Sequence, residues 1–166
     1  MVITLFGCAD EAKLSITFGT GQYGPPIGVD TRCDNGGCEG PVQLEVQVSV
    51  EAKDHPNAAF EILQYRVDYD LTGVEEQVPY FAGVTSLNVS ADTPATLNVH
   101  AAGERQREWV LSRYGYDSID GTATLTLAGY DQDDKVITSE APFDIQFGDF
   151  PSGGGGDKDG GSEDAP

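Results

Sequence analysis

The sequence predicts an all-β fold in which one antiparallel β-sandwich spans about residues 43–151. The first observation behind this prediction is a strict alternation of apolar and polar residues along several successive segments, which is the pattern of half-buried strands. The second is that turn-forming residues separate these segments at intervals too short for the crossover helices that parallel strands need. A chain of 166 residues has room for one such domain with a single core, plus tails.

The clearest strand covers residues 43–50, where the sequence QLEVQVSV places four apolar side chains on one face, namely Leu44, Val46, Val48 and Val50. A second strand is expected at 63–71, where tyrosine, valine and leucine alternate with glutamine, arginine and aspartate. Shorter β-prone runs follow at 84–89 and 96–99, with the turn signal ADTP between them. The last strands are expected at 121–130, 136–138 and 143–147.

Residues 103–114 (GERQREWVLSRY) are the helix candidate, because Trp109, Val110 and Arg113 stand near helical spacing. We expect a short crossover helix at one end of the sandwich, with Trp109 filling the core in preference to serving as a ligand platform. The tail over 152–166 (SGGGGDKDGGSEDAP) is glycine-rich, acidic and nearly devoid of apolar groups, so it is predicted to be disordered.

Residues 14–42 are predicted to form a Gly/Pro-rich extension outside the sandwich. A β-prone run at 14–18 leads into GTGQYG, which formally matches the GxGxxG motif. Pro25 and Pro26 follow directly, and proline cannot propagate the helix that a dinucleotide site requires. Residues 19–42 are therefore expected to be a long loop, either a plain part of the extension or a binding surface.

The charge balance excludes some classes of partner. Nine basic residues stand against 28 acidic ones, giving a formal net charge of −19. Nucleic acid and anionic membrane surfaces both reward lysine and arginine, so neither is an expected partner. The acidic residues are spread along the chain, which indicates a solvated acidic surface of the kind found in proteins from saline environments. No run of 18 apolar residues occurs, which excludes a transmembrane helix.

The first residues of the chain carry a possible export signal. Residues 1–7 (MVITLFG) are apolar and Cys8 follows them, so that Leu5-Phe6-Gly7-Cys8 resembles the lipobox of bacterial lipoproteins. The resemblance implies acylation of Cys8, a signal remnant and tether over 1–13, and export to the cell envelope with membrane contact only through the lipid. Seven residues are fewer than a signal peptide needs, which is a departure from the family. The alternative is an apolar strand end at 3–6.

The other two cysteines are predicted to form a disulfide. Cys33 and Cys38 enclose the turn-forming tetrad DNGG, and their pairing leaves Cys8 free for a lipid. A bond that closes so short a loop contributes about 2 kcal/mol, enough to fix a loop but not to organise a fold. Zinc is the alternative, although C-x4-C lacks the usual second pair of ligands and His55 and His100 are the chain's histidines.

The order of the predicted strands resembles immunoglobulin-like or fibronectin-like modules of bacterial surface and periplasmic proteins. The likeness covers residues 43–150 and depends on a threonine-rich strand, an aspartate-rich hairpin and the final FDIQF. It implies a scaffold that binds through exposed loops or an open sheet edge. Cys33 and Cys38 depart from antibody domains, because they are too close in sequence to bridge two sheets.

Candidate chemistry is sparse. A catalytic base would have to be His55 or His100, but no G-x-S-x-G nucleophile elbow occurs, so the chain is not expected to be an enzyme. Calcium takes oxygen ligands, and the best cluster for it is Asp131 with Asp133 in the last hairpin. The alternative for these two residues is ordinary turn chemistry, in which aspartate side chains bind local backbone N–H groups.

The leading functional expectation is a non-enzymatic exported lipoprotein that serves as a structural or interaction module of the cell envelope. It would have no cofactor and would bind a protein or glycan partner. The alternative is a carbohydrate-binding or adhesive module assisted by calcium at Asp131 and Asp133.

Overall fold

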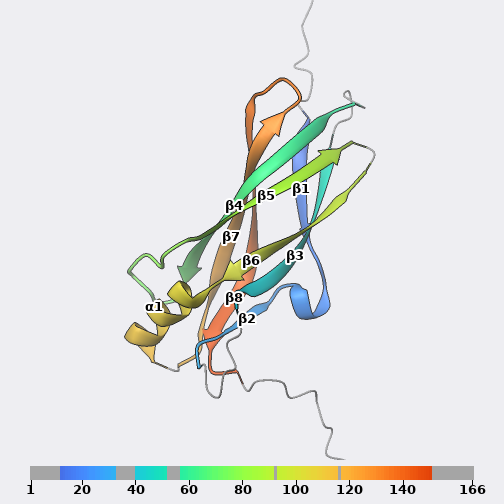
Figure 1. Ribbon diagram of the computed structural model, residues 1–166. Helices are drawn as coiled ribbons and strands as arrows, with labels where there is room; N and C mark the ends of the chain where they lie inside the picture. Colours follow the sequence, from blue (N-terminus) through green and yellow to red (C-terminus); the bar gives the residue numbers. More distant parts are fainter. Residues whose placement is uncertain (1–11, 33–39, 52–56, 92, 116, 151–166) are drawn as a thin grey trace, which may run out of the picture.

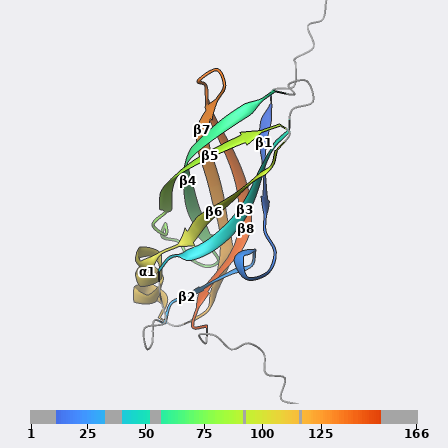
Figure 2. The same ribbon diagram turned by 45° about the vertical axis from the view of Figure 1, so that its right-hand side comes forward.

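The computed structural model describes residues 12–32, 40–51, 57–91, 93–115 and 117–150. Within these ranges the chain consists mainly of strands in two sheets, together with one α-helix (Figure 1). This arrangement confirms the predicted all-β class. The two sheets face each other, and both twist and curl around a common apolar core (Figure 2).

The smaller sheet has three antiparallel strands in the order β1 (Lys13–Phe18), β3 (Val42–Glu51) and β6 (Ala95–Ala102). The central strand β3 confirms the alternation read from the sequence, since Leu44, Val46 and Val48 are fully buried and the residues between them are not. β6 is longer than the predicted 96–99. Its last two residues, Ala101 and Ala102, are both buried, and this breaks the period of two that the prediction relied on.

The larger sheet has five strands in the order β2 (Ile27–Asp30), β8 (Val136–Gly148), β7 (Ile119–Asp131), β4 (Ala59–Leu71) and β5 (Phe81–Ser90). Neighbouring strands are antiparallel except for β2 and β8, which are parallel. The runs predicted at 136–138 and 143–147 belong to the single strand β8. Pro142 made a continuous strand look improbable, because proline lacks the N–H that a central strand needs. β2 pairs with β8 only from Ile145 onward, so at Pro142 the strand has β7 as its paired neighbour in this sheet and the missing N–H breaks no ladder with β2.

The predicted extension over 14–42 contributes an edge strand to each sheet. β1 pairs with β3, and β2 pairs with β8, with a 3-10 helix (Gly21–Tyr23) between them. The prediction of a loop over 19–42 is therefore wrong for β2. Four residues are too few to show a period, and the surrounding glycines and prolines read as a loop.

The core lies between the sheets, and two tyrosines of β4 cross it to reach β6. The Tyr69 hydroxyl donates a hydrogen bond of 2.6 Å to Ala101 O, and the backbone N–H of His100 donates to the Tyr65 hydroxyl at 3.2 Å. The Tyr69 ring also packs edge-on against Phe147 with 5.9 Å between centroids. On this side the two sheets are therefore joined by side chains, because β4 and β6 belong to different sheets.

Helix α1 (Glu104–Tyr114) confirms the helix predicted at 103–114. It joins β6 of the smaller sheet to β7 of the larger one, so it is the expected crossover. It lies at one end of the two sheets, and the β7–β8 hairpin lies at the other end (Figure 1). Trp109 is partly buried against the core, and the Arg113 guanidinium lies 4.3 Å from its ring centroid. No helix in the described ranges is long and apolar enough to cross a membrane.

Candidate functional site

Several residues singled out by sequence lie outside the described residues. These are Cys8, Cys33, Cys38 and His55. Lipid attachment at Cys8 and a disulfide between Cys33 and Cys38 therefore stay predictions, as does disorder of the tail at 152–166.

Asp131 and Asp133 lie in the turn between β7 and β8. One carboxylate oxygen of Asp131 accepts hydrogen bonds from the backbone N–H groups of Asp133 and Lys135, both at 2.9 Å. Asp134 completes the turn with a positive φ of 60°. This is the turn chemistry by which aspartate stabilises a hairpin. In the part of the chain that the structure describes, no group of three or more acidic, histidine or cysteine side chains is arranged to hold a metal ion.

His100 lies on β6 and is half-buried. Its imidazole packs edge-on against the Phe81 ring with 5.9 Å between centroids, and its backbone N–H binds the Tyr65 hydroxyl. These contacts give His100 a packing role at the side where β5 and β6 approach each other.

A shallow groove of about 410 Å³ lies on the outer face of the larger sheet, across β4, β5 and β7. Small residues of β5 and β7 form part of its lining, namely Ala82, Gly83 and Ala128. Larger residues complete it: Gln64, Tyr65, Arg66, Tyr80, Val84 and Thr126. We call this feature the Tyr80 groove. Its volume falls within the range of about 300–1,000 Å³ that small-molecule sites occupy.

The Tyr80 groove follows from the strand register. Arg66 on β4 stands between Ala82 on β5 and Thr126 on β7, and Thr126 in turn stands beside Glu140 on β8. Alternation along β4 turns Arg66 outward while Val67 is fully buried on the inner face. Gly83 permits close packing beneath the groove, since a Cβ there would lie 2.4 Å from the Tyr65 ring.

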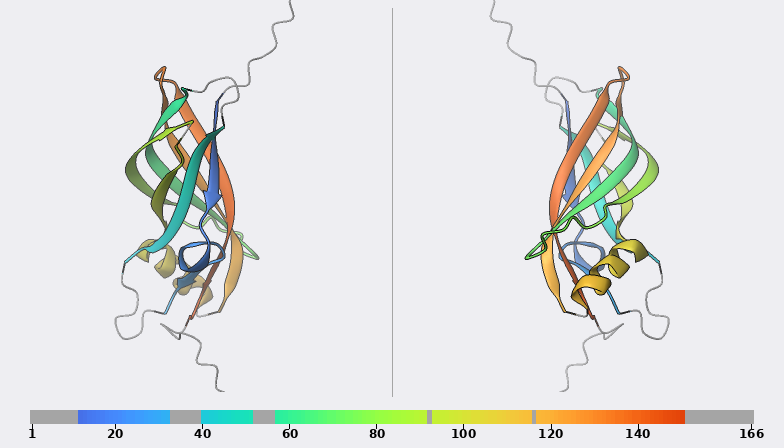
Figure 3. Two further views of the ribbon diagram at one scale, coloured as in Figure 1. Left: turned by 90° about the vertical axis from the view of Figure 1, so that its right-hand side faces the viewer. Right: turned by 90° about the vertical axis from the view of Figure 1, so that its left-hand side faces the viewer.

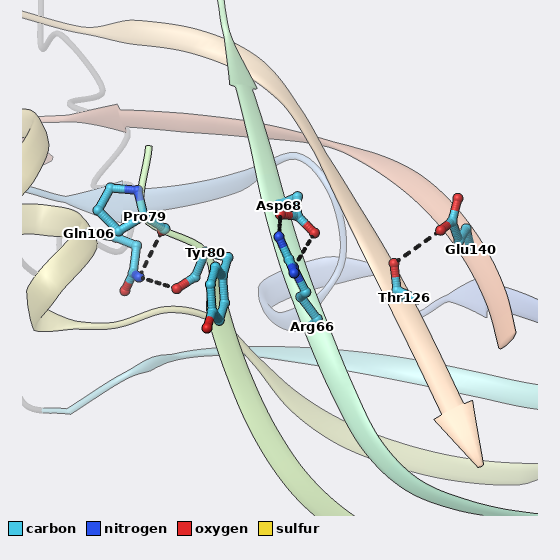
Figure 4. Close-up of polar contacts among 7 residues, drawn as sticks. All are labelled: Arg66, Asp68, Pro79, Tyr80, Gln106, Thr126 and Glu140. Carbon is cyan, nitrogen blue, oxygen red and sulfur yellow. Dashed lines mark hydrogen bonds and ion pairs between the residues drawn. The ribbon is translucent and has the colours of Figure 1, made fainter. Parts of the chain in front are cut away.

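Arg66 is held in place by two neighbours (Figure 4). Its Nε and Nη2 donate to the two carboxylate oxygens of Asp68 at 2.7 and 2.5 Å, a bidentate ion pair. Its guanidinium also lies 4.2 Å from the centroid of the Tyr80 ring. The hydrogen bonds to Asp68 raise the pKa of Arg66, so it stays charged. The pair is locally neutral and holds the guanidinium over the ring.

Tyr80 is itself positioned from helix α1. The Gln106 side chain is buried, and its Nε2 donates to the backbone oxygens of Pro79 and Tyr80, each at 3.0 Å (Figure 4). Its Oε1 accepts from the backbone N–H of Gly103 at 3.0 Å, which caps the helix. One amide therefore fixes the helix start and the backbone just before β5 at the same time.

Neither Tyr80 nor Gln106 was among the residues that the sequence predicted for a functional site. Tyr80 precedes β5, which begins at Phe81 and not at the predicted residue 84. Gln106 stands at the third position of the helix, where a glutamine commonly caps the first turn, and this spacing from Gly103 was a signal available in the sequence.

Comparisons with known proteins add little. No protein-family model matches the chain, and a search of curated proteins found no match. Among solved structures, the chain is similar to the crystal structure of a protein from Archaeoglobus fulgidus, with 10% sequence identity and a TM-score of 0.37. That match covers 84% of this chain and 97% of the other.

Proposed function

We propose that the chain is an exported, non-enzymatic lipoprotein of the cell envelope, a binding module on an immunoglobulin-like scaffold whose binding surface is the Tyr80 groove. The observation that carries the proposal is the exposure of Tyr80 and Val84, at 49% and 89%, beside the polar side chains of Gln64, Arg66 and Thr126 in one groove. Tyrosine and arginine are also the residues most enriched at the centres of binding interfaces. The two facing, largely antiparallel sheets support the scaffold, although the parallel strand β2 and the strong curl depart from the antibody pattern.

Attachment through Cys8 would set the orientation of the module. Strand β1 begins at the end of the sheets that carries the β7–β8 hairpin (Figure 3), and Ala12, just before it, lines one pocket together with Asp131 and Lys135 of that hairpin. Four residue steps separate Cys8 from Ala12, a reach of at most about 14 Å for an extended chain. The hairpin end would therefore be held near the membrane, with helix α1 at the far end.

Mass spectrometry of protein expressed with its native upstream sequence in an exporting host tests the lipid anchor. We expect a mature chain that begins at an acylated Cys8 and fractionates with membranes. A Cys8→Ser variant should be unacylated and unprocessed at this site. An intact, unacylated Cys8 in the wild-type protein would contradict the anchor and leave the groove proposal standing.

A neutral glycan is the ligand that the groove favours. The face of the Tyr80 ring that Arg66 does not cover offers a flat apolar surface. Gln64 offers an uncharged hydrogen-bonding group beside it, and the Thr126 hydroxyl, which donates to Glu140 at 3.4 Å, can still accept a hydrogen bond. Arg66 is neutralised by Asp68, and Glu140 lies one strand beyond Thr126, so an anionic ligand would meet repulsion. This observation supports the carbohydrate-binding alternative without requiring calcium.

NMR titration with neutral hexose and N-acetylhexosamine oligosaccharides tests this ligand class. We expect amide shifts around Arg66, Ala82 and Thr126, and at least a tenfold weaker affinity in Tyr80→Ala. Tyr23→Ala is the matched control, because Tyr23 is 45% exposed and does not line the groove, so its affinity should equal the wild type. Equal binding by Tyr80→Ala, or no binding of any oligosaccharide at 10 mM (about the weakest affinity worth assigning), rejects the glycan.

Calcium dependence is tested by thermal unfolding with and without calcium. Asp131→Asn keeps an oxygen for the turn amides of Asp133 and Lys135 but removes the charge that calcium requires. A rise in melting temperature with calcium that disappears in Asp131→Asn combined with Asp133→Asn would support the calcium-assisted form. The same rise in both proteins would place calcium elsewhere.

A further inference from the structure

Strand β5 is a sheet edge that lacks charged residues and proline, although a β-bulge interrupts its ladder with β4 between Ile62 and Gln64. It is the outer strand of the larger sheet (Figure 3), and among the described residues its one ladder is with β4, apart from a bridge between Ser90 and Thr93 near the turn to β6. Its ten residues, FAGVTSLNVS, contain no charged residue and no proline, in a chain where 22% of residues are charged. Sheet edges that are meant to stay unpaired usually carry lysine, proline or another block to pairing. β5 therefore has the composition of an edge that is free to pair.

The other edge strands are short, charged or engaged. β2 has four residues and ends in Asp30, and β1 begins with Lys13. The backbone oxygen of Leu14 on β1 also accepts a bond of 3.0 Å from the Ser139 hydroxyl. β6 is bonded through its backbone to the hydroxyls of Tyr65 and Tyr69. Outside its ladder with β4, and among the described residues, the backbone of β5 has one hydrogen bond, from Thr93 N to Ser90 O.

The inner face of β5 is also incompletely covered. Phe81, Thr85 and Leu87 point toward the core but are only half-buried, whereas inward-facing Val67 and Leu125 on the neighbouring strands are fully buried. A further strand beside β5 would cover the exposed parts of these side chains. Backbone hydrogen bonds and apolar burial would then both favour its addition.

We propose that β5 binds an extended segment of a partner protein as an added strand, with small apolar side chains alternating with lysine or arginine. The outward side chains of β5 that such a segment would flank are uncharged, and those of Ala82 and Ser86 are also small. The net charge of −19 favours a basic segment and opposes a second copy of this chain, since two copies would repel each other. This inference shares the binding role proposed above but does not depend on the Tyr80 groove.

The probe is a ten-residue peptide of alternating lysine and valine, titrated into the full chain at physiological salt. We expect β5 amides to shift and to become protected from hydrogen exchange. An alternating glutamate and valine peptide should bind at least tenfold more weakly. The lysine peptide with backbone N-methyl groups on consecutive central residues should also bind at least tenfold more weakly. It keeps its charge, but neither of its two edges can form a complete ladder of hydrogen bonds with β5.

Two variants of the protein locate the site. Ser86→Lys places a charge on the exposed edge and should weaken peptide binding at least tenfold. Thr122→Lys makes the same change of charge at an exposed position of β7, inside the sheet, and should change affinity less than twofold. Tyr80→Ala should leave peptide binding unchanged, so that failure of the groove and failure of the edge are distinguishable.

Three results would overturn the proposal. The first is equal loss of affinity in Ser86→Lys and Thr122→Lys, which would indicate attraction by charge alone. The second is undiminished binding of the N-methylated peptide. The third is a dimer of the wild-type chain in sedimentation that Ser86→Lys converts to monomer, since the edge would then belong to a second copy.

Discussion

Replacing Gln106 with alanine should lower the free energy of unfolding by about 3 kcal/mol. The substitution removes three hydrogen bonds, each worth about 1 kcal/mol. The backbone oxygens of Pro79 and Tyr80 and the N–H of Gly103 then lose their hydrogen-bond partner. Water cannot easily replace it, because the Gln106 side chain is only 2% exposed. Urea unfolding monitored by far-UV circular dichroism gives the difference.

Arg105→Ala is the matched control for this prediction. Arg105 lies one position earlier on the same helix, is exposed, and should cost less than about 0.5 kcal/mol when replaced. A loss below about 1 kcal/mol in Gln106→Ala would mean that water or a neighbouring group replaces the amide.

The same substitution should also affect binding. The amide of Gln106 holds the backbone at Tyr80, so its loss should let the Tyr80 ring move relative to Arg66. We expect ligand affinity at the Tyr80 groove to fall in Gln106→Ala and to stay unchanged in Arg105→Ala. Gln106 is therefore a positioning residue, and the ratio of the two affinities measures that role separately from stability.

The strands were predictable where the two faces of a strand have different surroundings. β3 and β4 alternate because one face meets the core and the other meets water, and this pattern is visible without a structure. β2 has only four residues, so no period can establish itself. The position of Pro142 likewise became intelligible only when the pairing showed that β8 has a single neighbour there.

The candidate site was less predictable than the fold, for a related reason. Asp131 was correctly placed in a hairpin, because turn residues act on their immediate sequence neighbours. Arg66, Tyr80 and Thr126 are far apart in sequence and become neighbours only through the register of three strands and the path that Gln106 fixes. A single sequence gives the faces of strands but leaves their register open.

The unfolding free energy of the protein should fall steeply above pH 10, because Tyr69 is buried. Burial raises the pKa of Tyr69 well above its ordinary value of 10, and the negative charge of Asp68 raises it further. The unfolded chain releases this proton near pH 10, whereas the folded chain keeps it. The contribution of Tyr69 to stability is thus complete below pH 10 and should fall above it by about 1.4 kcal/mol per pH unit.

Tyr69→Phe isolates this effect. The variant should be about 1 to 1.5 kcal/mol less stable at pH 8, because Ala101 O loses the hydroxyl that donates to it at 2.6 Å. Above pH 10 the variant has no hydroxyl at position 69 that could ionise in the unfolded chain, so its unfolding free energy should fall less steeply with pH. The two curves should cross at about pH 11. Tyr23→Phe, at a 45% exposed position, should give a curve parallel to the wild type. If the Tyr69→Phe curve is also parallel, the hydroxyl ionises freely in the folded state, and the link between β4 and β6 is open to solvent.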